Sequence, residues 1–136
     1  MRTEFCKIFG IEHPVVLAPM AGVVSDALVA AVSNAGGLGL APLWHVSASD
    51  LRHSVRNIKQ LTEKPFGVNL NMEFPSMEHL DACLEEGIEV ISLFWQAPGE
   101  FLAHAQSGGA KVIYSAGDAA DAKAVADFGA DAICAQ

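Results

Sequence analysis

Cysteine is scarce in this sequence, and the few cysteines present are not spaced as ligands or as a disulfide framework. Only three occur in 136 residues, Cys6, Cys83 and Cys134, an odd number without a Cys-x-x-Cys pair. This pattern excludes a disulfide-rich scaffold and a structural zinc finger. It indicates a reduced, cytoplasmic protein, and the N-terminal residues lack the apolar stretch of a secretory signal peptide.

Positive charge is also scarce. Eight Lys and Arg residues stand against sixteen Asp and Glu residues, which gives a formal net charge of −8. Non-specific nucleic-acid binding needs a basic surface, and so does docking on an anionic membrane, so neither partner is expected. The sequence also has no Gly-x-Ser-x-Gly motif, and no pair of histidines is spaced with a carboxylate as metal ligands. No metal is expected.

Hydrophobic residues, by contrast, are abundant. They make up 51% of the chain, and the mean hydropathy of +0.31 excludes an intrinsically disordered protein. The length suits a single domain over residues 1–136. This is more apolar material than a lone small domain readily buries, and it is the first indication that the core is incomplete.

Short apolar runs alternate with helix-length segments along the whole chain. Strands are predicted at 14–20, 38–41, 66–70, 89–94, 111–115 and 131–135. Helices are predicted at 27–34, from Ser47 or Ser49 to 61, and at 76–84, 100–106 and 118–128. Alternation of this kind is typical of βαβ units and a parallel sheet. Periodicity alone leaves open a doubly wound sheet or part of an eight-stranded barrel.

Two turns of the predicted fold contain small residues. Pro19, Met20 and Ala21 lie where the first strand gives way to the first helix, at the edge where parallel α/β folds bind ligands, and would let a flat ligand approach the backbone. An ordinary turn explains them as well. The glycines of residues 36–39 follow a helix and precede a strand, which is the reverse of a phosphate-binding loop. They are interpreted as a helix C-cap with close helix–sheet packing.

Polar and aromatic side chains at the carboxyl ends of strands are the candidate site residues. Asn69 alternates with Gly67 on one face of its strand, and its amide could pair with the edge of a heterocycle or cap the next turn. Trp95 would wall a pocket or close a barrel mouth. His45 is the candidate acid or base and, with Trp95, a candidate substrate-pocket residue.

Three further histidines are predicted to be solvated. His53, His79 and His104 lie on the polar faces of predicted helices, where a lone histidine rarely has a chemical role.

Five segments together resemble one family. Residues 14–22, 31–39, 65–70, 90–95 and 129–136 occur in the order seen in nitronate monooxygenases, formerly called 2-nitropropane dioxygenases. The resemblance extends over the whole chain. A related family, the flavin-dependent enoyl-acyl-carrier-protein reductases, shares most of these motifs.

The resemblance implies an α/β fold of the (β/α)₈ TIM-barrel class, with FMN at the carboxyl-terminal mouth. It implies a monooxygenase, a flavoprotein that oxidises alkyl nitronates with O₂. The backbone of Pro19, Met20 and Ala21 would border the flavin ring, and Asn69 and Gln136 would hydrogen-bond FMN. Two alternatives remain. One is an FMN-dependent enoyl reductase that uses NAD(P)H, and the other is a catalytically silent partial barrel.

The family pattern continues after Gln136 with a glycine and then an acidic-Ala-Gly-Gly-His segment that supplies the catalytic base. The glycine-rich phosphate loops follow later still. The resemblance therefore implies the N-terminal part of a barrel, truncated after about the sixth strand, with its catalytic residue unknown within this chain. We expect this chain to be inactive alone, to bind FMN weakly or not at all, and to self-associate through open strand edges.

Overall fold

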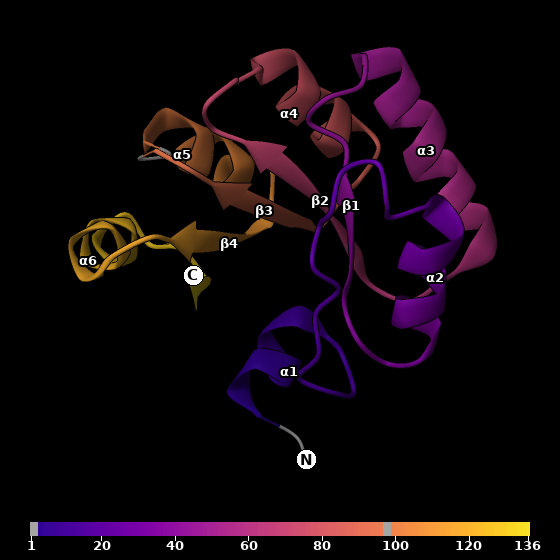
Figure 1. Ribbon diagram of the computed structural model, residues 1–136, viewed down its shortest axis with the longest axis horizontal. Helices are drawn as coiled ribbons and strands as arrows, with labels where there is room; N and C mark the ends of the chain where they lie inside the picture. Colours follow the sequence, from indigo (N-terminus) through magenta and orange to yellow (C-terminus); the bar gives the residue numbers. More distant parts are fainter. Residues whose placement is uncertain (1–2, 97–98) are drawn as a thin grey trace.

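A computed structural model describes residues 3–96 and 99–136 of the chain (Figure 1). Five parallel strands form one sheet in sequence order. The strands are β1 (Gly39–Pro42), β2 (Phe66–Asn71), β3 (Val90–Phe94), β4 (Lys111–Ala116) and β5 (Ala132–Ala135). The helices are α1 (Glu4–Phe9), α2 (Asp26–Asn34), α3 (Ala48–Leu61), α4 (Met77–Glu85), α5 (Gly99–Ser107) and α6 (Ala119–Asp127). No helix of the described residues is long and apolar enough to cross a membrane. The Ala-Pro-Gly sequence of residues 97–99 predicts a turn, and residues 97–98 lie outside the described residues.

Short polar side chains start the helices that follow the strands. Ser47 accepts a hydrogen bond from the backbone N–H of Asp50, and Ser76 does the same for His79. Ser25 and Asp118 cap α2 and α6 in the same way. These caps satisfy backbone donors that have no partner within the helix, so the predicted helix starts are confirmed.

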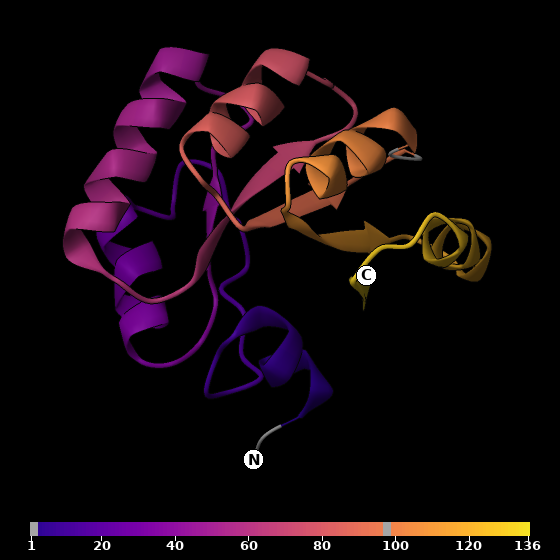
Figure 2. The same cartoon turned by 180° about the vertical axis from the view of Figure 1, so that it is seen from behind.

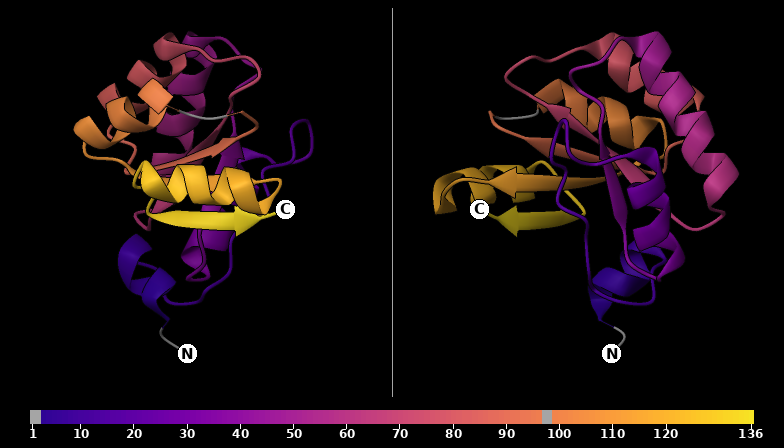
Figure 3. Two further views of the ribbon diagram at one scale, coloured as in Figure 1. Left: turned by 90° about the vertical axis from the view of Figure 1, so that its left-hand side faces the viewer. Right: turned by 45° about the vertical axis from the view of Figure 1, so that its right-hand side comes forward.

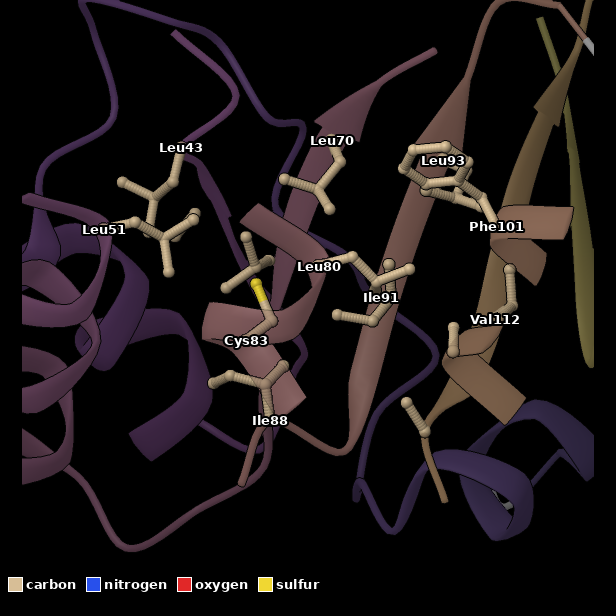
Figure 4. Close-up of a cluster of buried hydrophobic side chains, with 14 of the residues drawn as sticks. Leu43, Leu51, Leu70, Leu80, Cys83, Ile88, Ile91, Leu93, Phe101 and Val112 are labelled. Atoms are coloured by element: carbon tan, nitrogen blue, oxygen red, sulfur yellow. The ribbon is translucent and has the colours of Figure 1, made fainter. Parts of the chain in front are cut away.

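One face of the sheet carries the main hydrophobic core. Val68 and Leu70 of β2 belong to this core, and Figure 4 shows Leu80 against Ile91 and Leu51 beside Leu43 there. The helices after β1 to β4 cover this face, as Figures 1 and 2 show. Because side chains alternate along a strand, Gly67, Asn69 and Asn71 face the other way.

The glycines of residues 36–39 bring α2 and β1 together. Gly36 has a φ of 87°, the left-handed conformation of a helix C-terminus. The Gly39 N–H donates to Ser33 Oγ at 3.2 Å, and a Cβ on Gly39 would clash with the carbonyl oxygen of Val29. The predicted structural role of this segment is therefore confirmed.

Helix α1 is absent from the predicted elements and lies apart from the outer helices (Figures 1 and 3). Thr3 caps its start and Gly10, with a φ of 68°, follows its end. Its Cys6 and Phe9 form a second core with inner side chains of the sheet, including Leu40, Val90 and Ile113. Six residues are too short for helical periodicity to show, although a threonine cap and a following glycine were visible signals.

The prediction of a strand at residues 14–20 is wrong. This segment forms a single isolated parallel bridge, between Val16 and Leu38, and does not join the sheet ladder. Pro14 and Pro19 have no backbone N–H and so limit pairing on both sides of the bridge. The segment nevertheless runs beside β1, at the place of a preceding strand.

Candidate functional site

A pocket of about 640 Å³ lies on the inner face of the sheet, opposite the outer helices. It receives side chains from the segment before α2, from all five strands and from α1. Its lining is Phe5, Pro14, Val16, Leu17, Ala18, Pro19, Met20, Leu40, Asn69, Ser92, Phe94, Trp95, Ile113, Ser115, Ala132, Ile133, Cys134 and Gln136. None of these residues is charged, so the described part of the chain offers this pocket an apolar wall with a few neutral polar groups.

Five of the seven predicted site residues line this pocket: Pro19, Met20, Asn69, Trp95 and Gln136. Ala21 is not among the lining residues, although it adjoins Met20. His45 lies in a separate pocket of about 310 Å³, between the segment before α2 and the turn after β1. The pocket also includes Ser92, Ser115 and Cys134, which were not predicted as site residues. In the sequence they look like ordinary strand residues, and only the register of the sheet places them at the pocket.

Asn69 is the most tightly held polar group of the pocket. It is 1% exposed, and its Nδ2 donates to the carbonyl oxygen of Ser92 at 3.3 Å and to Ser92 Oγ at 3.1 Å. The Ser92 carbonyl can only accept, so the amide nitrogen must face Ser92. The orientation of the Asn69 amide is therefore fixed.

This orientation leaves the Oδ1 atom of Asn69 buried without a hydrogen-bond partner in the described structure. A buried acceptor left unpaired destabilises a protein by about 1–3 kcal/mol. Such a group at a ligand pocket is satisfied most simply by a ligand N–H or O–H donor. Gly67, on the same face of β2, leaves no open space beneath Asn69, because a Cβ there would meet the Leu40 side chain and the Val90 carbonyl within 2.8 Å.

The prediction that His79 is solvated is also wrong. Its Nε2 lies 2.6 Å from the carbonyl oxygen of Val46, and its Nδ1 lies 2.7 Å from Ser76 Oγ. Because the Val46 carbonyl accepts, Nε2 carries the proton in this arrangement. His79 thus fastens the turn after β1 to the start of α4, while exposed His45 projects from that turn beside the Trp44 ring.

The described residues contain no cluster of three His, Cys, Asp or Glu side chains that could hold a metal ion. His104 instead pairs with Asp81 at 2.7 Å on the surface. Neutral polar groups and aromatic rings therefore make up the chemistry that these residues bring to the pocket.

The cysteines are expected to differ sharply in reactivity. Cys134 is exposed and lines the pocket, whereas Cys83 is buried behind the sheet. Burial raises the pKa of the Cys83 thiol to about 12. At pH 8, therefore, only about one in ten thousand Cys83 side chains is in the reactive thiolate form. We expect an aromatic disulfide reagent to label Cys134 quickly and Cys83 only on unfolding. Cys134→Ser should abolish the fast phase, and a fast phase that survives this substitution would contradict the assignment.

Comparisons with known proteins give consistent results. The model of the nitronate monooxygenase family matches residues 2–79. A 5-hydroxy-7a-methyl-1-oxo-octahydro-1H-indene-4-carboxyl-CoA dehydrogenase of Rhodococcus jostii is 36% identical over 137 residues, which cover 100% of this chain and 39% of the relative. A nitronate monooxygenase of Pseudomonas aeruginosa is 47% identical over 70 residues, 52% of this chain and 20% of the relative.

Among solved structures, FabK from Thermotoga maritima superimposes with a TM-score of 0.94 at 34% identity. The match covers 98% of this chain and 43% of FabK. The chain therefore spans about two fifths of the length of the relatives that match it throughout.

Proposed function

Since the chain belongs to the nitronate monooxygenase family, we propose that it is the N-terminal part of a flavin-dependent nitronate monooxygenase whose cofactor is FMN. The family is one of flavin-dependent oxidoreductases. The fold agrees, because five consecutive parallel strands with helices on one face form part of a TIM barrel, and the match to FabK confirms that class. The substrates proposed for the protein are an alkyl nitronate and O₂.

The unpaired Oδ1 atom of Asn69 is the observation that carries the proposal. A flavin ring is flat and largely apolar, with an N–H donor and carbonyl acceptors at one edge. Asn69 presents a buried acceptor within an apolar pocket, so the residues present fit the ring of the cofactor. When bound, a flavin would accept electrons from the nitronate and pass them to O₂.

The other predicted site residues would contact the flavin ring or the substrate in this proposal. Pro19 and Met20 supply apolar surface against the ring, with Ala21 in the turn beside them, and Gln136 supplies a second amide. Trp95 walls the pocket. His45 opens on the neighbouring pocket and would face substrate rather than flavin. A cytoplasmic location and small molecules as partners complete the proposal.

Substituting Asn69 tests the flavin assignment. We expect Asn69→Ala to weaken flavin binding by about 0.5–1.5 kcal/mol, or roughly 2- to 12-fold in Kd, because one hydrogen bond is lost. The matched control is Asn57→Ala, since Asn57 lies on α3 and its Nδ2 donates to Asp26 Oδ2 at 3.4 Å, away from the pocket. Titration of flavin fluorescence measures both, and equal effects of the two substitutions would contradict the placement of Asn69.

Oxygen consumption tests the reaction itself. The purified full-length protein, of which this chain is proposed to be the N-terminal part, is expected to consume O₂ when an alkyl nitronate is added, in proportion to its bound flavin. A flavin-loaded protein that consumes no O₂ with any of a series of short alkyl nitronates would refute the monooxygenase proposal.

A second candidate is a flavin-dependent oxidoreductase that acts on an acyl thioester. The Rhodococcus jostii relative, whose name includes a carboxyl-CoA substrate, matches this chain from end to end, and FabK superimposes closely. An enoyl reductase would consume NAD(P)H with a crotonyl-type thioester and would give no nitronate-dependent oxygen consumption. The two assays therefore separate the candidates.

A further inference from the structure

Two neighbouring residues at the end of β3 have an unusual backbone conformation. Trp95 has a φ of 63° and Gln96 a φ of 58°, and both are in the left-handed region that disfavours residues with a Cβ. Each such residue destabilises a chain, so a pair of them persists only where the surroundings hold it.

The left-handed pair changes where the side chains point. Along a regular strand, consecutive side chains face opposite sides of the sheet. Phe94 and Trp95 are consecutive, yet both line the inner pocket. Their rings lie 6.4 Å apart with planes at 71°. The turn at Trp95 and Gln96 thus brings the indole to the pocket side of the sheet.

The hydroxyl of Tyr114 holds this turn from the opposite side of the sheet. It donates to the carbonyl oxygen of Gln96 at 2.7 Å, while the ring is completely buried in the core beneath the outer helices. Burial raises the pKa of Tyr114 to about 12, and the nearby carboxylate of Asp121 acts in the same direction. The hydroxyl therefore keeps its proton and remains a donor at neutral pH.

We propose that Tyr114 is a positioning residue for Trp95: by holding the Gln96 carbonyl, it keeps the left-handed turn in place and the indole at the pocket mouth. In that position the indole narrows the pocket, so that only a flat ring can bind there. The ligand's identity as a flavin rests on the proposed function, whereas the coupling of Tyr114 to Trp95 does not.

The test measures the local motion of Trp95 by time-resolved fluorescence anisotropy. The chain has two tryptophans, so Trp44→Phe leaves Trp95 as its only indole. In this background Tyr114→Phe removes one hydroxyl and preserves the buried ring. We expect the amplitude of nanosecond indole motion to rise about twofold. An unchanged amplitude would overturn the proposal.

Ser107→Ala is the matched control. The Ser107 hydroxyl also donates to a backbone carbonyl, that of His104, at 2.8 Å, but on the exposed end of α5. This substitution should leave the motion of Trp95 unchanged. A rise as large as that of Tyr114→Phe would show a general loosening and would overturn the proposed coupling.

A second variant tests, by rescue, whether the Tyr114 hydroxyl acts through the left-handed turn. Gln96→Gly keeps the carbonyl and removes the Cβ that opposes a positive φ. In the Tyr114→Phe background it should reverse at least about half of the added motion, since glycine adopts the turn without the hydroxyl. Motion that stays fully raised in the double variant would contradict the role of the strained turn.

Flavin titration extends the test to the site. We expect Tyr114→Phe to raise the Kd for FMN about threefold, with no change for Ser107→Ala. If the full-length parent protein binds no flavin, the proposed function fails, and the anisotropy result still decides the coupling of Tyr114 to Trp95. If flavin binds but Tyr114→Phe leaves its Kd unchanged, Trp95 does not restrict the site.

Discussion

Gly39→Ala is expected to lower the free energy of unfolding by about 3 kcal/mol, the largest effect of any single methyl group in this chain. The added Cβ would clash with the carbonyl oxygen of Val29 and lie 2.9 Å from Ser33 Oγ. Backbone of α2 cannot yield as the end of a flexible side chain would. The methyl group must therefore push α2 away from β1 or break the Gly39–Ser33 hydrogen bond.

Gly117→Ala is the matched control for this prediction. A Cβ on Gly117 would meet no atom within 4 Å, and its φ is not in the left-handed region. The free energy of unfolding should change by less than about 0.5 kcal/mol. Urea unfolding followed by circular dichroism measures both variants. Equal stabilities would show that α2 does not pack against β1 as described.

Self-association of the 136-residue chain is the second large effect expected. β5 is an edge strand of the described sheet, and its residues are mostly exposed, with Ile133 38% exposed. Met20, which lines the same inner-face pocket as Ile133, is 46% exposed. Unpaired strand edges and wide apolar surfaces bind other chains. Light scattering at about 100 µM should therefore give a mass of at least a dimer.

Ile133→Lys should shift this mass toward the monomer, because a lysine on an edge strand opposes pairing. Phe128→Lys is the matched control, since Phe128 is 54% exposed but follows α6 rather than lying on a strand. A parent chain that remains monomeric, or a mass that responds equally to both substitutions, would contradict association through β5.

Most of the architecture could be predicted from the sequence because its signals are local. The helix starts are indicated by N-cap residues such as Ser47, Ser76 and Asp118, and the strands by apolar runs of four to six residues. The exceptions are physical. Residues 14–20 have the composition of a strand, but Pro14 and Pro19 limit their pairing. They therefore form one isolated bridge to the residue before β1 instead of a continuous ladder of hydrogen bonds.

The candidate site was predictable only in part, because it depends on register. Asn69 stands out as an amide at a strand end, and it does line the pocket with Gln136. Ser92 could not be recognised as its partner until the pairing of β2 with β3 placed the two opposite each other. His79 was misjudged because its contact with Val46 joins residues 33 apart in sequence.

The absence of charged residues from the pocket lining leads to the most direct test of the proposal that this chain forms one wall of a flavin site. Because no described lining residue is charged, the chain should hold the ring and give the phosphate no partner. Titration of the 136-residue chain should therefore give Kd values for FMN and riboflavin that agree within about threefold and lie above about 10 µM. Asn69→Ala should weaken both. Tight, stoichiometric binding that strongly favours FMN, or binding indifferent to Asn69→Ala, would contradict the account.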